Sequence, residues 1–191
     1  SYTAPLVVER DPRFPDEARG EEGDAQEELA LRLREYISRL SGIVKQVRAL
    51  RKQLDLQAEL MADADQPEAR KLREQGEALA GKLKELERKL HNPDAEVTYD
   101  IFAREGGAML YSQFVALLSF VTAAEGEPTQ GMRRVARELG AELAQYEKEF
   151  AVLRANEAAA FNAFAREHGL PPLWLPGGDG GAAAPAKAAS P

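Results

Sequence analysis

Residues 29–61 read LALRLREYISRLSGIVKQVRALRKQLDLQAELM, and the spacing of their apolar side chains decides the fold. These side chains recur at alternating intervals of four and three residues, with only Gln57 interrupting: Leu29, Leu33, Tyr36, Leu40, Ile43, Val47, Leu50, Leu54 and Met61. Alternation of four and three is the a/d heptad pattern, which places one apolar stripe, here called the heptad seam, along a helix. The pattern predicts a long helix over residues 24–62, with Asp24 and Glu27 as a capping box at its start.

A second helix is predicted over residues 67–91. Pro67 suits the first turn of a helix, where its missing N–H is no loss, and leucines repeat the heptad seam as far as Leu90. The connection from the first helix is so short that the two helices should form an antiparallel hairpin. Gly76 falls in the seam itself, which favours a close approach between helices or a bend at that point.

Two more helices complete the pattern. Residues 108–124 are apolar around most of the helix circumference, so we expect this helix to be the most buried element. Thr129 is a plausible N-cap for a fourth helix over residues 129–168, and Gly169 suits its C′ position.

Together these elements predict an all-α fold over residues 24–176, an elongated antiparallel bundle or coiled-coil hairpin of about four helices. After the fourth helix, the PPLWLP stretch should lay Trp174 back on the bundle, and the Gly/Ala/Pro-rich residues 177–191 should be disordered. Residues 1–10 alternate as a β-strand does, which leaves an orphan strand joined to the bundle by a linker over residues 11–23.

Composition excludes several kinds of chemistry. The chain has no cysteine and only two histidines, His91 and His168, each of which falls at the end of a predicted helix. A net charge of −7 argues against nucleic-acid binding, because contacts to phosphate require a basic surface. No apolar run is long enough for a membrane span. We therefore assign no catalytic, cofactor-binding or metal-binding residue.

The densest basic cluster consists of Lys45, Arg48, Arg51 and Lys52. These side chains lie mainly outside the heptad seam, where charges usually form a solvated coiled-coil face. The alternative is a binding surface for an acidic partner or a phosphate group. These four residues are the possible partner-binding residues of the chain.

Two segments carry a family resemblance: SYTAPLVVERDPR at residues 1–13, and HNPDAEVTYDIFAREGGAMLYSQFVALLSFVTAAEGEPTQGMRR at residues 91–134. Together with the heptad hairpin, they resemble the C-terminal end of bacterial sortilin-like BNR/Asp-box β-propeller proteins, often labelled glycosyl hydrolases. The resemblance implies that residues 1–10 are the last strand of an immunoglobulin-like domain, that the parent protein is exported or periplasmic, and that the parent's propeller and immunoglobulin-like domains are partners. The Asp-box repeat itself is absent from these residues, so no catalytic residue is carried over.

The expected function is therefore a non-catalytic helical module for scaffolding, oligomerisation or protein–protein interaction. A homo-oligomer joined through the heptad seams is one form of this function. Two alternatives remain: a part of a glycoside hydrolase whose active site lies on the propeller, and a free-standing coiled-coil adaptor.

Overall fold

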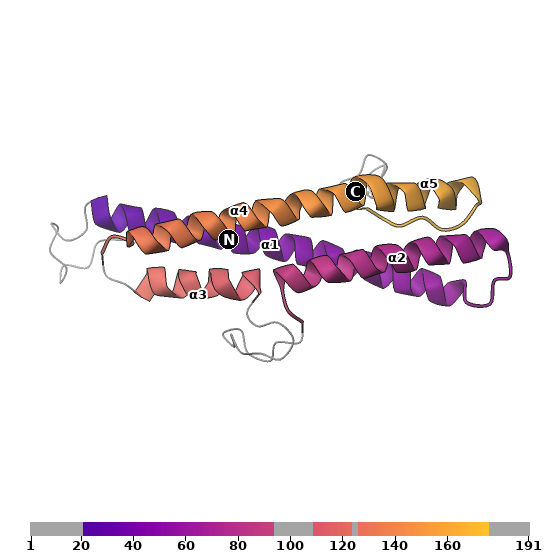
Figure 1. Cartoon of the computed structure of the whole chain (residues 1–191), viewed down its shortest axis with the longest axis horizontal. Helices are drawn as coiled ribbons and strands as arrows, with labels where there is room; N and C mark the ends of the chain where they lie inside the picture. Colours follow the sequence, from indigo (N-terminus) through magenta and orange to yellow (C-terminus); the bar gives the residue numbers. More distant parts are fainter. Residues whose placement is uncertain (1–20, 94–108, 124–125, 176–191) are drawn as a thin grey trace, which may run out of the picture. The chain divides into compact units, whose positions relative to one another are not determined.

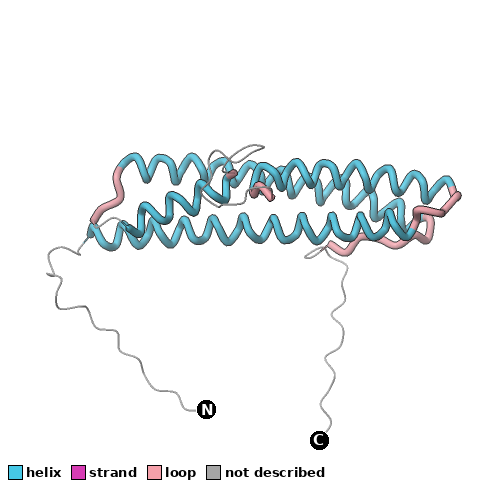
Figure 2. Tube along the Cα trace, turned by 90° about the horizontal axis from the view of Figure 1, so that it is seen from below, coloured by secondary structure: helices cyan, strands magenta, loops and turns pink. Residues whose placement is uncertain are grey.

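The chain folds into helices joined by loops. The computed structural model describes residues 21–93, 109–123 and 126–175. Their elements, in chain order, are α1 (Glu21–Leu60), α2 (Pro67–Leu90), α3 (Leu110–Ala123), α4 (Gln130–Val152), the π-helix η2 (Leu153–Ala158) and α5 (Ala159–Glu167) (Figure 1). Figure 2 shows no strand within these residues, so the predicted all-α helical bundle is confirmed. The predicted strand over residues 1–10 and the predicted disordered tail over residues 177–191 lie outside the described residues.

The start of α1 differs from the prediction. The helix already includes Glu21, so Asp24 lies within it and is not its N-cap, and residues 21–23 are helical where a linker was predicted. At α2 the prediction holds: the helix begins at Pro67, and Arg70 N donates to Gln66 O at 3.2 Å. The residues of the DQPEA turn therefore start the helix as their types favour.

The final helix ends where the glycine pattern predicts. Gly169 has a φ of +66°, a conformation that favours glycine. Gly169 N donates to Arg166 O at 3.3 Å, and Leu170 N donates to Ala165 O at 2.7 Å. These two bonds form a Schellman motif, which satisfies carbonyls of the last turn and reverses the chain.

The chain divides into two compact units. The first unit contains the described residues of 21–41 and 89–145, and the second contains those of 42–88 and 146–175. The boundaries follow Ser41 in α1 and Gln145 in α4.

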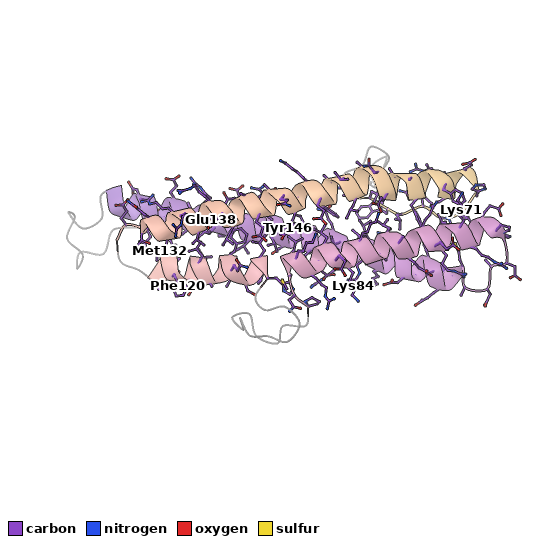
Figure 3. The ribbon with its side chains drawn as sticks, viewed as in Figure 1. Lys71, Lys84, Phe120, Met132, Glu138 and Tyr146 are labelled. Atoms are coloured by element: carbon purple, nitrogen blue, oxygen red, sulfur yellow. The ribbon has the colours of Figure 1, made fainter. Side chains whose placement is uncertain are left out.

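The core of the first unit combines leucines with an aromatic pair. Its most deeply buried large side chains are Leu33, Leu40, Leu90, Leu110, Phe114, Val121 and Leu143. The Tyr36 ring lies 5.5 Å from that of Phe114, and it also lies against Gly140 of α4, where an added Cβ would come within 2.9 Å of the ring. The expected burial of α3 does not extend to Phe120, which is 64% exposed and is labelled in Figure 3.

The core of the second unit is formed by the heptad seams of α1 and α2 together with side chains of α5. Its buried residues include Val47, Leu50, Leu54, Leu72, Leu79, Leu83, Leu86 and Phe161. Gly76 is also buried, and an added Cβ would lie 3.4 Å from both the Leu54 and the Phe161 side chains, which supports the predicted close approach. The seam is therefore covered within a single chain.

The π-helix η2 interrupts the predicted fourth helix for a reason visible in the sequence. Leu153 and Ala158 are both buried but are five residues apart. An α-helix brings residues three or four apart to one face, whereas a π turn bonds residue i to residue i+5. The π turn thus keeps both residues in the core. Within the same turn, Glu157 Oε1 forms an ion pair with Lys82 Nζ at 2.7 Å.

Candidate partner-binding surfaces

The predicted basic cluster lies on α1 in the second unit, and it faces a carboxylate of the same chain. Arg48 Nε and Arg51 Nη1 donate to the two carboxylate oxygens of Glu87 on α2, each at 2.6 Å. The Glu87 side chain is only 4% exposed. A buried carboxylate requires such partners, because an unpaired charge in the interior is strongly unfavourable.

This arrangement divides the four predicted cations into two pairs. Arg48 and Arg51 stabilise the carboxylate on α2, whereas Lys45 and Lys52 are exposed to solvent. An acidic partner would therefore meet the lysine pair and the half-exposed Arg48 side chain. The two arginines have a structural role between α1 and α2.

A different surface is built around a segment that follows the last helix and is neither helix nor strand, residues 171–174, which we call the strap. Side-chain amides bind its backbone at three points. Asn162 Nδ2 donates to Leu173 O at 2.9 Å while Leu173 N donates to Asn162 Oδ1 at 2.6 Å. Gln53 Nε2 donates to Trp174 O at 3.2 Å, and Trp174 N donates to Gln53 Oε1 at 2.8 Å. Gln57 Nε2 donates to Pro171 O at 3.0 Å.

The strap corrects the expectation for Trp174. Leu173 is 3% exposed, whereas Trp174 is 66% exposed, so the leucine and not the tryptophan lies back on the helices. Asn162 binds the backbone of Leu173, whose side chain is buried, and the side chain of Trp174 that follows faces solvent.

Three large apolar side chains on the strap side of the second unit are exposed, and we call them the Trp174 surface. They are Trp174, Leu56 at 54% and Leu60 at 72% exposure. Leu56 and Leu60 lie three and seven residues after Gln53, so all three share one flank of α1. Gln53 binds the backbone of Trp174, which places the tryptophan on that flank.

The core of the second unit leaves little space for a small molecule. No group of three or more His, Cys, Asp or Glu side chains within them is placed to hold a metal ion. A cavity of about 50 Å³, lined by residues that include Leu54, Gly76 and Phe161, is far smaller than the roughly 300–1,000 Å³ of ordinary ligand pockets. The two histidine rings each lie against an aromatic ring, His91 at 5.2 Å from Tyr111 and His168 at 4.4 Å from Phe164.

Sequence reasoning missed the Trp174 surface, although a signal existed. Leu56 and Leu60 fall outside the heptad seam, which continues through Leu54 and Met61. Large apolar residues that are out of register with a seam are candidates for a second, exposed face. Gln53 and Gln57 gave no such signal, because they lie 121 and 114 positions from the strap residues that they bind.

Comparison with known proteins adds no relative. No family model, no curated protein and no solved structure matches the chain. Within the described part of the chain, no helix combines the length and the apolar character that crossing a membrane requires.

Proposed function

We propose that this chain is a non-catalytic helical module that binds protein through the Trp174 surface, with a second copy of the chain as its first partner. The observation that carries the proposal is the exposure of Trp174, Leu56 and Leu60 at 66, 54 and 72%. Tryptophan is enriched among the residues that dominate protein–protein binding energy, and exposed apolar groups gain most when a partner removes them from water.

The filled heptad seams support this choice of surface. Leu33, Leu40, Val47, Leu50 and Leu54 are each at most 4% exposed within one chain. An oligomer that used these seams would first have to open the core. The Trp174 surface requires no such opening, and its side chains carry no charge to oppose the approach of a second copy.

The resemblance to sortilin-like BNR/Asp-box proteins supplies the wider context of the proposal. On that basis the module would belong to the C-terminal end of an exported parent and would serve its assembly. The adaptor alternative receives less support, because Arg48 and Arg51 are engaged by Glu87.

The single tryptophan of the chain makes the proposal directly measurable. Light scattering on the full 191-residue chain across a concentration series should show a mass above that of the monomer. The fluorescence of Trp174 should shift to shorter wavelength over the same range, because its indole leaves water. The variant Leu60→Ser, which retains the fluorophore, should weaken both changes.

Phe120→Ser is the matched control, since Phe120 is 64% exposed but lies on α3 in the first unit. It should leave both readings unchanged. A chain that stays monomeric at every concentration with constant fluorescence would contradict the proposal. So would an equal loss of association in the two variants.

A further inference from the structure

The first unit carries four arginines around two adjoining hollows, which we call the arginine groove. One hollow, of about 120 Å³, lies between α1 and α4 and is lined by residues that include Arg32, Arg133 and Arg137. The other, an open hollow of about 420 Å³, is lined by Gln130, Gly131, Arg133, Arg134 and Arg137. The two hollows share Arg133 and Arg137, so they form one continuous basic surface.

The groove is positive overall, although the chain has a net charge of −7. Four arginines and one carboxylate, Glu28, line the two hollows, and counting the Glu127 and Glu138 carboxylates that pair with Arg133 and Arg134 leaves a local net charge of +1. Arg137 is the most unusual of the four. Within the described residues it has no ion pair or side-chain hydrogen bond, and its helical neighbours at three and four positions are Arg133, Arg134, Gly140 and Ala141.

The position of Arg137, next to other arginines and without an ion pair among the described residues, is unfavourable when no anion is bound. Like charges four residues apart on a helix destabilise it, and Arg133 and Arg137 are such a pair. The start of α4 at Gln130 adds the positive end of a helix dipole. The local field therefore favours a negatively charged ligand.

The carboxylates that already contact the groove are exposed and easily exchanged. Arg32 pairs with Glu28 at 2.6 Å, Arg133 pairs with Glu127, and Arg134 lies 3.9 Å from Glu138. The three glutamate side chains are 59–70% exposed. Exposed pairs of this kind contribute little to stability, so an incoming anion loses little by displacing them.

We propose that the arginine groove binds an oxyanion of the phosphate class. A single carboxylate is matched by one guanidinium fork, whereas a phosphate group offers several oxygens and up to two charges. Three arginines from two helices line the smaller hollow, which has room for several water-sized groups at the roughly 10–15 Å³ that each requires. This site lies in the first unit and goes beyond the protein-binding function proposed above.

The test is a titration of the full chain with inorganic phosphate at constant ionic strength, followed by calorimetry. Arg137→Gln should raise the dissociation constant about tenfold or more, because it removes a charge-assisted hydrogen-bond donor. The matched control is Arg34→Gln, since Arg34 is also an exposed arginine of the first unit but does not line the groove. It should leave the dissociation constant within about twofold. Thermal melts should show both variants folded, because both positions are exposed.

A second arm of the experiment identifies the source of the phosphate group. The chain is sedimented with phosphatidylcholine vesicles that contain phosphatidic acid. Arg137-dependent binding to these vesicles and to inorganic phosphate assigns the groove to a lipid headgroup, and Arg137-dependent binding to inorganic phosphate alone assigns it to a soluble phosphate. Three results would overturn the proposal: no binding of inorganic phosphate, equal weakening by the two variants, or equal affinity for acetate.

Discussion

The two units join their helices with opposite chemistry. In the first unit α1 meets α4 where the hydroxyl end of the Tyr36 ring lies against Gly140, which has no side chain. In the second unit α1 meets α2 across the buried carboxylate of Glu87 and its two arginines. The first contact depends on shape, whereas the second depends on charge. Leaving a buried charge without its partner costs more free energy of unfolding than a small steric overlap between side chains does.

The largest expected effect comes from removing both charge partners in the second unit. Arg48→Gln combined with Arg51→Gln leaves the Glu87 carboxylate buried without a countercharge. We expect the free energy of unfolding, measured by urea denaturation, to fall by about 3–5 kcal/mol. The control Lys45→Gln with Lys52→Gln removes the same charge from exposed positions of the same cluster and should change stability by less than about 0.5 kcal/mol each. Equal losses in the two double variants would show that the cluster acts only through its overall charge.

A smaller effect is expected from releasing the strap. Asn162→Ala removes both hydrogen bonds that hold the buried Leu173 backbone, and each unsatisfied buried group costs about 1–3 kcal/mol. Because the strap is able to separate and recover water, we expect a total loss of about 2 kcal/mol. The local signature is faster amide hydrogen exchange at Leu173, with little change at Leu110 in the first unit. Unchanged protection of Leu173 would argue against the clamping role of Asn162.

The smallest effect concerns the shape-dependent contact of the first unit. Gly140→Ala places a Cβ within 2.9 Å of the Tyr36 ring, whose movement is limited by Phe114. Overpacking should outweigh the gain in helix propensity and leave a net loss of about 1 kcal/mol. Gly81→Ala, where nothing lies within 4 Å of the new Cβ, should instead stabilise the chain by up to about 1 kcal/mol.

A double-mutant cycle with Tyr36→Leu sharpens this last comparison. If the ring causes the loss, Gly140→Ala should be much less damaging when the ring is absent, and the two substitutions should not be additive. Additive effects of Tyr36→Leu and Gly140→Ala would place the cause elsewhere.

The all-α class and the course of its helices could be predicted because the heptad pattern is a local signal. The apolar seam positions of α1 are all buried apart from Tyr36, which is partly exposed, and Val44, outside the seam, is buried as well. Even Gln57, the one interruption, is buried at 8% exposure, since its amide binds the strap. Periodicity reports which side of a helix is covered but not which segment covers it.

The ion pairs of the basic cluster could not be predicted, because periodicity does not show which residues of different helices lie together. Glu87 and Arg48 are 39 positions apart, and nothing local distinguishes Glu87 from the exposed acids of α2. For the same reason Arg48 and Arg51 were indistinguishable from Lys45 and Lys52 as partner-binding residues. The RRVAR run at residues 133–137 did contain a readable signal, namely an arginine without an acid one turn away in either direction.

The π turn between Leu153 and Ala158 has a consequence for how this helix tolerates changes of length. A single inserted residue would rotate everything downstream of it in an uninterrupted α-helix, but a π turn absorbs one residue locally. The converse also holds, because deleting one of residues 154–157 would leave Leu153 and Ala158 four apart, a spacing that an α-helix accommodates. This turn is therefore the position at which the chain should lose a residue with the least disturbance to either flanking helix.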